Sequence, residues 1–273
     1  SIQDLEKNGE GKNEALYLNL IAQGAVLNTS LQNILEEAIK GLPIAKMMHY
    51  QIKTANGEIS DVQFARPVHR ILALHGSKTL PIHAFGIQSS NLTEGHRFMS
   101  SGTLCIDAAD AYEKQLEEKG GVIASFAKRR ERIQADLLRA AKEHGLTVLM
   151  PDSLLDEVTA LVEYPTIYVC QFDPEFLEVP QECLILTMQT NQKYFALTDA
   201  QGKLSNQFLI VSNIQTSNPN SIISGNERVI RPRLADARFF YLQDQKKTLE
   251  SRIPELEKVI YHNQLGNQLQ RSE

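Results

Sequence analysis

The sequence contains no tryptophan and only three cysteines among its 273 residues. The three, Cys105, Cys170 and Cys183, are far apart and odd in number, which predicts reduced thiols in a cytoplasmic protein rather than a disulfide framework. No apolar run approaches the ~18 residues that a transmembrane helix requires, so we expect no membrane partner. The histidines show neither HExxH nor paired Cys/His spacing, so we expect no metal site.

Positive charge is not in excess either. Lys and Arg number 28 against 33 Asp and Glu, which gives a net charge of −5. Such a surface does not attract nucleic acid as a whole, so any binding of a polyanion has to come from a local patch. The sequence also lacks a P-loop, a dinucleotide-binding glycine pattern and any internal repeat, so we expect no cofactor in this part of the protein.

Hydrophobic periodicity predicts both helices and strands. Thr29 and Gln32 have capping-box spacing, which predicts a helix that begins near Thr29 and ends at Gly41. Three more helices are expected between residues 107 and 163, and another over residues 254–261. Strands are expected over residues 47–52 and 62–74 around an Asn56-Gly57 turn, over 146–150 and 167–172, and as a hairpin of 194–197 with 208–212.

One basic stretch, residues 225–241, presents two different stripes at helical spacing. The apolar stripe consists of Ile230, Leu234, Ala237 and Tyr241, and the basic stripe of Arg228, Arg231 and Arg238. Guanidinium groups match phosphate bidentately, so the basic stripe fits a polyanion. The alternative is a solvated helix whose arginines pair with nearby carboxylates.

Pro232 lies within this stretch and cannot donate a helical hydrogen bond. The helix therefore either begins near Arg231 or has a kink at Pro232. We favour the first, with Pro232 in the first helical position and Arg228 on the preceding loop.

Three other short motifs carry polar groups that could meet a ligand. In residues 64–69 (Phe-Ala-Arg-Pro-Val-His), Pro67 is awkward in a central strand, so this portion is either a short helix or a sheet edge. Residues 95–98 (Gly-His-Arg-Phe) offer a donor, a cation and a stacking surface. The amides of Gln189, Asn191 and Gln192 precede the hairpin and either satisfy loop backbone groups or contact a ligand.

Taken in order, these motifs resemble one protein family. They are residues 64–69, 95–98, 188–195 (Met-Gln-Thr-Asn-Gln-Lys-Tyr-Phe) and 225–237 (Gly-Asn-Glu-Arg-Val-Ile-Arg-Pro-Arg-Leu-Ala-Asp-Ala). Together with residues 42–47 and 156–165, they closely resemble the β subunit of bacterial glycyl-tRNA synthetases, over roughly residues 12–273.

The resemblance implies an enzyme of two α and two β subunits. The α subunit would activate glycine with ATP and Mg²⁺, while the β subunit would recognise glycine tRNA. It implies an α+β fold with a mixed or antiparallel sheet and packed helices, similar to the editing-type domain of the phenylalanyl-tRNA synthetase β subunit. Residues 1–252 would form this domain without its first segment, and residues 253–273 would start a following HD-type helical domain.

No catalytic residue is expected here, since nothing resembles an ATP site. Hydrolytic editing is weakly motivated, because no nucleophile–base pair is visible and glycine is too small to be sieved by size. Docking on the α subunit without RNA contact is a further alternative. The residues expected to contact tRNA are basic, amide or aromatic members of the motifs: Arg66, His69, His96, Arg97, Gln189, Lys193, Tyr194, Arg228, Arg231 and Arg233.

Overall fold

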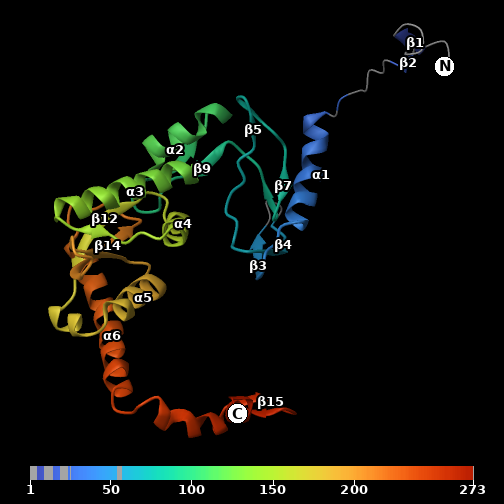
Figure 1. Ribbon diagram of the computed structural model, residues 1–273. Helices are drawn as coiled ribbons and strands as arrows, with labels where there is room; N and C mark the ends of the chain where they lie inside the picture. Colours follow the sequence, from blue (N-terminus) through green and yellow to red (C-terminus); the bar gives the residue numbers. More distant parts are fainter. Residues whose placement is uncertain (1–4, 9–14, 19–23, 25, 54–56, 273) are drawn as a thin grey trace. The chain divides into compact units, whose positions relative to one another are not determined.

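The computed structural model describes residues 5–8, 15–18, 24, 26–53 and 57–272 (Figure 1). The chain divides into two compact units. The smaller unit comprises residues 1–93 and 105–110, and the larger unit residues 94–104 and 111–273. Among the described residues, no helix is both long and apolar enough to cross a membrane.

Among its described residues, the smaller unit contains helix α1 and several short antiparallel strand pairs. Helix α1 spans Leu27–Lys40 and ends at Gly41 as expected. Its predicted capping box is wrong, because the helix begins before Thr29, whose hydroxyl donates to the Val26 carbonyl. The strand pairs are β1 (Leu5–Asn8) with β2 (Ala15–Leu18), β3 (Met48–Lys53) with β4 (Ile59–Phe64), β5 (Leu74–His75) with β6 (Lys78–Thr79), and β7 (His83–Ala84) with β8 (Ile87–Gln88).

The β3–β4 hairpin confirms the predicted strand pair only in part. Asn56 lies outside the described residues, while Gly57 has the positive φ of 83° that a tight turn requires. The second strand ends at Phe64, so the prediction of a strand reaching Leu74 is wrong. The segment 65–70 forms neither a helix nor a strand, because Pro67 has no N–H with which to extend the β4 ladder. Strands β9 (Leu92–Glu94) and β10 (Thr103–Cys105) lie where the chain passes between the units.

The larger unit is built around a four-stranded antiparallel sheet with the order β11-β13-β14-β12. Its strands are β11 (Thr147–Val148), β12 (Thr166–Gln171), β13 (Phe195–Thr198) and β14 (Leu204–Ser212). The β13–β14 pair confirms the hairpin that is predicted from two apolar runs on either side of a polar turn, residues 199–202. The described part of the chain is therefore α+β with antiparallel sheets, apart from one isolated parallel bridge between Leu72 and Ser90.

Helices cover both faces of this sheet (Figure 1). Helices α3 (Phe126–Glu143) and α4 (Asp152–Leu161) pack on the face that receives Phe195, Leu197 and Leu209. Helices α5 (Gln181–Gln192) and α6 (Asn220–Asp244), with the 3₁₀ helix η4 (Pro174–Glu178), pack on the face that receives Ala196 and Phe208. The sheet is thus buried on both sides, since successive residues of a strand point to opposite faces.

The three helices expected between residues 107 and 163 are α2 (Tyr112–Gly120), α3 and α4, with a short 3₁₀ turn, η3 (Ala109–Ala111), before them. Arg130 bridges α3 to α4. Its guanidinium pairs with Asp156 at 2.6 Å and with Asp152 at 2.7 Å. Both hydrogen bonds raise the pKa of this guanidinium, and the Asp156 bond is the larger cause.

The helix that carries the basic stripe corrects the prediction made from Pro232. Helix α6 spans Asn220–Asp244 and continues through Pro232, so Arg228 is helical and not on a loop. Tertiary packing explains the difference, because Ile230 and Leu234 are fully buried on either side of the proline. Burial of these two side chains against the sheet offsets the ~3 kcal/mol cost of an interior proline.

The segment after α6 also differs from prediction. Instead of a helix over residues 254–261, the chain forms the 3₁₀ helix η5 (Glu250–Lys258) and then strand β15 (Ile260–His262). Pro254 removes a backbone donor from this segment, which favours the shorter turn. Strand β16 (Gly266–Asn267) and helix α7 (Gln268–Ser272) follow. A domain boundary near residue 252 stays a prediction.

Candidate functional site

Helix α6 positions two exposed arginines beside the end of strand β12. Ile230 and Leu234 face the sheet and are fully buried, which fixes the rotation of the helix about its axis. Arg228 and Arg231 are three residues apart and therefore neighbours on the helix surface. Both side chains are exposed, as is Arg233. The predicted apolar stripe thus sets the direction of the basic residues.

The three arginines of the predicted stripe have different surroundings. Arg238 pairs with Glu178 at 3.1 Å and with Glu175 at 3.7 Å, both on η4. Within the part of the chain that the structure describes, neither Arg228 nor Arg231 makes an ion pair or a side-chain hydrogen bond. The alternative of internal ion pairing is therefore confirmed for Arg238, whereas polyanion binding by Arg228 and Arg231 stays a prediction.

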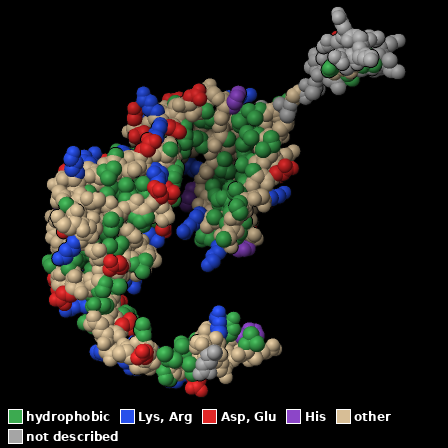
Figure 2. All heavy atoms as spheres, in the orientation of Figure 1, with side chains coloured by type: hydrophobic (Ala, Val, Ile, Leu, Met, Phe, Trp, Pro, Cys, Tyr) green, Lys and Arg blue, Asp and Glu red, His purple; other side chains and the backbone are tan. Residues whose placement is uncertain are grey.

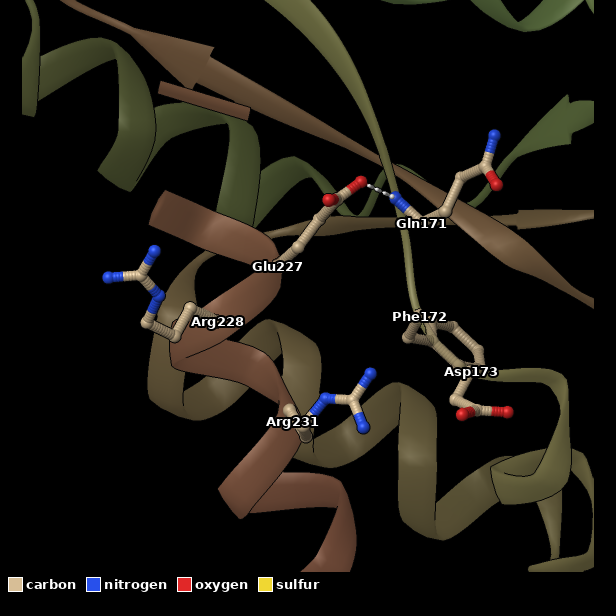
Figure 3. Close-up of a pocket in the computed structure, with 6 residues that line it drawn as sticks. All are labelled: Gln171, Phe172, Asp173, Glu227, Arg228 and Arg231. Atoms are coloured by element: carbon tan, nitrogen blue, oxygen red, sulfur yellow. Dashed lines mark hydrogen bonds between the residues drawn. The ribbon is translucent and has the colours of Figure 1, made fainter. Parts of the chain in front are cut away.

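A cavity of about 410 Å³ lies beside these two arginines. Its lining residues come from α6 and from the chain that leaves β12: Gln171, Phe172, Asp173, Glu227, Arg228 and Arg231. Figure 3 shows the Arg231 side chain extending toward the side on which Phe172 and Asp173 lie, whereas Arg228 extends away from them. The cavity is therefore lined by two cations and two carboxylates.

Glu227 anchors α6 to the edge of the sheet. One of its carboxylate oxygens accepts a hydrogen bond of 2.8 Å from the backbone N–H of Gln171 (Figure 3). Strand β12 is an edge strand, so this amide has no neighbouring strand to pair with. The adjacent Cys170 thiol is fully buried. Burial, and secondarily the Glu227 charge, raise the pKa of this thiol to about 12.

Asp173 lies at the start of η4, where one of its oxygens accepts a hydrogen bond of 3.2 Å from the Glu175 N–H. Among the described residues, no ion pair joins Arg231 to Asp173 or to Glu227. Opposite charges thus line one cavity without neutralising each other directly. Such an arrangement suits a ligand that offers an anion to the guanidinium and a hydrogen-bond donor to the carboxylate.

Other predicted tRNA contacts in the same unit have structural partners. Lys193 adopts a left-handed backbone (φ of 60°) at the end of α5, and its ammonium pairs with Glu157 at 3.0 Å. Tyr194 is only 5% exposed, and its hydroxyl donates to Asn226 at 2.7 Å. Its ring stacks on Phe208, so in this conformation it cannot stack on a base. Gln189 is half-buried on α5.

Tyr194 also belongs to the buried core beneath α6. Burial, with a smaller effect of Cys170, raises the pKa of its hydroxyl to about 12. The hydrogen bond to Asn226 joins the start of β13 to the first half of α6. Tyr194 therefore helps to hold α6, the helix that carries the arginines, against the sheet.

His96 and Arg97 lie in the larger unit but do not line the arginine cavity. His96 is 2% exposed, and its Nδ1 accepts from the backbone N–H groups of Phe98 and Met99 at 3.2 Å. Its Nε2 has no partner among the described residues. Arg97 is exposed and lies over the ring of Phe98, with its guanidinium carbon 6.0 Å from the ring centre.

Arg66 and His69 belong to the smaller unit, where both are exposed on the irregular segment after β4. His69 lines a separate cavity of about 360 Å³ together with Lys53 and residues of β8. Across the described residues, no group of three or more His, Cys, Asp or Glu could hold a metal ion. Cys105, Cys170 and Cys183 are free thiols in the structure.

The sequence reading missed the two carboxylates of the cavity. Glu227 directly precedes Arg228 within a motif that was read only for its cations. Asp173 followed by Pro174 is a helix-start signal, because Asp caps the helix and Pro takes its first position. On the face that Figure 2 shows, Lys and Arg are interspersed with Asp and Glu, so a local site of mixed charge matches the overall composition.

Comparison with known proteins agrees with the family resemblance. Residues 1–273 match the family model described as glycyl-tRNA synthetase beta subunit. The chain is 55% identical over 269 residues to a glycine–tRNA ligase beta subunit of Ralstonia nicotianae, covering 98% of this chain and 38% of that protein. It is 51% identical over 272 residues to the glycine–tRNA ligase beta subunit of Methylobacillus flagellatus, and the match covers 99% of this chain and 38% of that protein. The chain therefore spans about two fifths of the length of these relatives.

Proposed function

Because the chain belongs to the family of glycyl-tRNA synthetase β subunits, we propose that the protein containing it attaches glycine to tRNA together with an α subunit. The relatives are named as β subunits of glycine–tRNA ligases, which supports an α-subunit partner. The proposed enzyme is a cytoplasmic assembly of two α and two β subunits. ATP and Mg²⁺ act on the α subunit, and no catalytic residue lies in this chain.

Within that enzyme, this part of the β subunit contacts glycine tRNA through Arg228, Arg231 and Arg233 of α6. The single observation that carries this proposal is that Arg228 and Arg231 are exposed and unpaired among the described residues, although carboxylates line the same cavity. A guanidinium with all its donors available matches a phosphate oxygen pair. Arg66, His69 and Arg97 are exposed and stay predicted contacts, whereas Tyr194 is assigned a structural role.

The test is glycylation of tRNA by the complete enzyme of α and β subunits. Replacing both arginines, in Arg228→Ala/Arg231→Ala, should raise the KM for tRNA about a hundredfold or more and change kcat less, because hydrogen bonds to charged groups are each worth about 1.5–3 kcal/mol. The matched control is Arg139→Ala, which removes an exposed arginine of α3 that pairs with Asp136. A KM for tRNA equal to that of the control would contradict the proposal.

A second candidate function, docking on the α subunit, is supported by a different part of α6. Phe239 and Phe240 are 56% and 64% exposed, and their rings touch edge to face with centroids 5.5 Å apart. Exposed aromatic pairs are typical of the buried centres of protein interfaces. We expect Phe239→Ala/Phe240→Ala to weaken co-purification of the two subunits, whereas Leu138→Ala on α3 should not. Equal recovery of the α subunit with both variants would exclude this role.

The finer fold assignment also belongs to the proposal. A helix-covered antiparallel sheet supports a likeness of the larger unit to the editing-type domain of the phenylalanyl-tRNA synthetase β subunit. A likeness of this kind would concern the fold alone, because function depends on the residues of the site.

A further inference from the structure

The cavity between α6 and η4 has a chemistry that a phosphate alone does not satisfy. Arg228 and Arg231 only donate hydrogen bonds, and the ionised carboxylates of Asp173 and Glu227 only accept them. A simple anion would bind the guanidinium groups and be repelled by the carboxylates. A ligand that fits has to carry an anion and a neutral donor on neighbouring atoms.

We propose that this cavity holds one ribonucleotide of the bound RNA, with its phosphate on Arg231 and its 2′-hydroxyl donating to Asp173. The inference rests on the proposed function, since it names the chemical group that the same site reads. Arg228 then holds the next phosphate along the strand. The 2′-hydroxyl is the group by which a protein distinguishes RNA from DNA, so the cavity makes this contact specific for RNA.

The hydrogen bonds already present indicate which acceptor is available. One oxygen of Asp173 is occupied by the Glu175 amide, and one oxygen of Glu227 by the Gln171 amide. The second oxygen of each carboxylate has no hydrogen-bond partner in the described part of the chain. Arg231 extends toward the side where Asp173 lies (Figure 3), so this cation and this carboxylate are the pair that one nucleotide can bridge.

The size of the cavity agrees with this assignment. Its volume of about 410 Å³ lies in the ~300–1,000 Å³ range of ordinary small-ligand sites, which is ample for one nucleotide. Its walls also hold their positions without the ligand. Glu227 is tied to β12, Asp173 caps η4, and Arg238 pairs with both glutamates of η4, so the site is largely formed before RNA arrives.

The experiment is 2′-deoxy interference mapping on the complete enzyme of α and β subunits. Glycine tRNA is transcribed with sparse random 2′-deoxy substitutions, and bound and free molecules are compared position by position. For the wild-type enzyme we expect 2′-deoxy substitutions at one or more positions to be depleted about threefold to tenfold from the bound tRNA relative to the free tRNA. Asp173→Ser should abolish the depletion at one of these positions, because serine still caps η4 but is too short to reach the ribose.

Asp199→Ser is the matched control, because Asp199 also accepts backbone hydrogen bonds in a turn but lies outside the cavity. An interference pattern that is identical in wild type and Asp173→Ser would overturn the inference. If Asp173→Ser lowers the unfolding temperature more than Asp199→Ser does, the same mapping is repeated with Asp173→Thr. Threonine also caps η4 and is also too short to reach the ribose.

Failure of the inference can be told apart from failure of the proposed function. If Arg231→Ala weakens tRNA binding but Asp173→Ser leaves the pattern unchanged, only the 2′-hydroxyl contact is wrong. If Arg228→Ala/Arg231→Ala leaves tRNA binding unchanged, the site does not meet RNA and both proposals fall.

Discussion

The carboxylate of Glu227 on α6 accepts a hydrogen bond of 2.8 Å from the backbone amide of Gln171 on β12. This hydrogen bond satisfies an amide of an edge strand, and Glu227 directly precedes Arg228 in the sequence. It therefore sets the position of the arginine-bearing helix against the end of the strand from which Phe172 and Asp173 follow.

Loss of this hydrogen bond should lower the free energy of unfolding by a measurable amount. We expect Glu227→Ala to lower the free energy of unfolding by about 1–2 kcal/mol, because a half-buried, charge-assisted hydrogen bond is lost. Asp236→Ala, also on α6 but exposed and without a side-chain hydrogen bond or ion pair among the described residues, is the control and should change stability by less than about 0.5 kcal/mol. Equal urea midpoints for the two variants would show that the bond contributes nothing.

Pro232 lies inside α6, where its ring meets the carbonyl of Arg228 and its missing N–H breaks one helical bond. Pro232→Ala should therefore raise the free energy of unfolding by about 1–3 kcal/mol. Chemical denaturation measures this directly. A variant as stable as wild type, or less stable, would contradict a net destabilising effect of the proline in α6.

Pro232 and the β13–β14 hairpin show what the sequence can and cannot predict. The hairpin was predictable because burial on both faces of the sheet gives each strand a continuous apolar run, and the turn between the two runs is local. The start of α6 was not, because the local preference of proline is outweighed by burial of residues distant in sequence. The irregular segment after Phe64 was likewise undecided by local preference.

The arginines of the candidate site could be proposed from their spacing alone. Which of them pair internally could not, because Glu175 and Glu178, the partners of Arg238, lie some sixty positions earlier in the sequence. For the same reason the proximity of Asp173 to Arg231 in one cavity is visible only in the structure.

Two glycines of the larger unit should respond to alanine in opposite directions. A Cβ at Gly225, inside α6, would meet no atom within 4 Å, so Gly225→Ala should stabilise by about 0.5–1 kcal/mol through helix propensity. A Cβ at Gly95 would clash with the backbone of Gly120, at its carbonyl oxygen and Cα. Because backbone atoms cannot rotate away, Gly95→Ala should destabilise by about 3 kcal/mol or more. Thermal unfolding of both variants checks the pair, and a tolerated Gly95→Ala would contradict the close backbone approach.

Stability should fall at alkaline pH because of Cys170. Its pKa is raised from 9.0 to about 12 in the folded protein, so above pH 9 the unfolded chain loses this proton while the folded chain keeps it. The free energy of unfolding is unaffected by this thiol below pH 9. It should then fall by up to about 1.4 kcal/mol per pH unit until about pH 12. Tyr194, raised from 10.0 to about 12, adds to the fall above pH 10.

The variant that isolates this effect is Cys170→Ala, compared at pH 8 and pH 11. It should lose less stability between these two values than wild type, and Cys183→Ala, an exposed cysteine, should lose as much as wild type. An equal loss in all three proteins would show that the buried thiol does not govern the alkaline transition.

The central claim is that Arg228 and Arg231 contact tRNA phosphates, and a salt series of tRNA binding by the complete enzyme tests it most directly. Each phosphate contact contributes about 0.7–0.9 to the slope of log affinity against log salt concentration. The Arg228→Ala/Arg231→Ala enzyme should therefore show a slope shallower by about 1.5, whereas Arg238→Ala, which breaks an internal ion pair of the same helix, should keep the wild-type slope. A double variant with the wild-type slope would contradict the account.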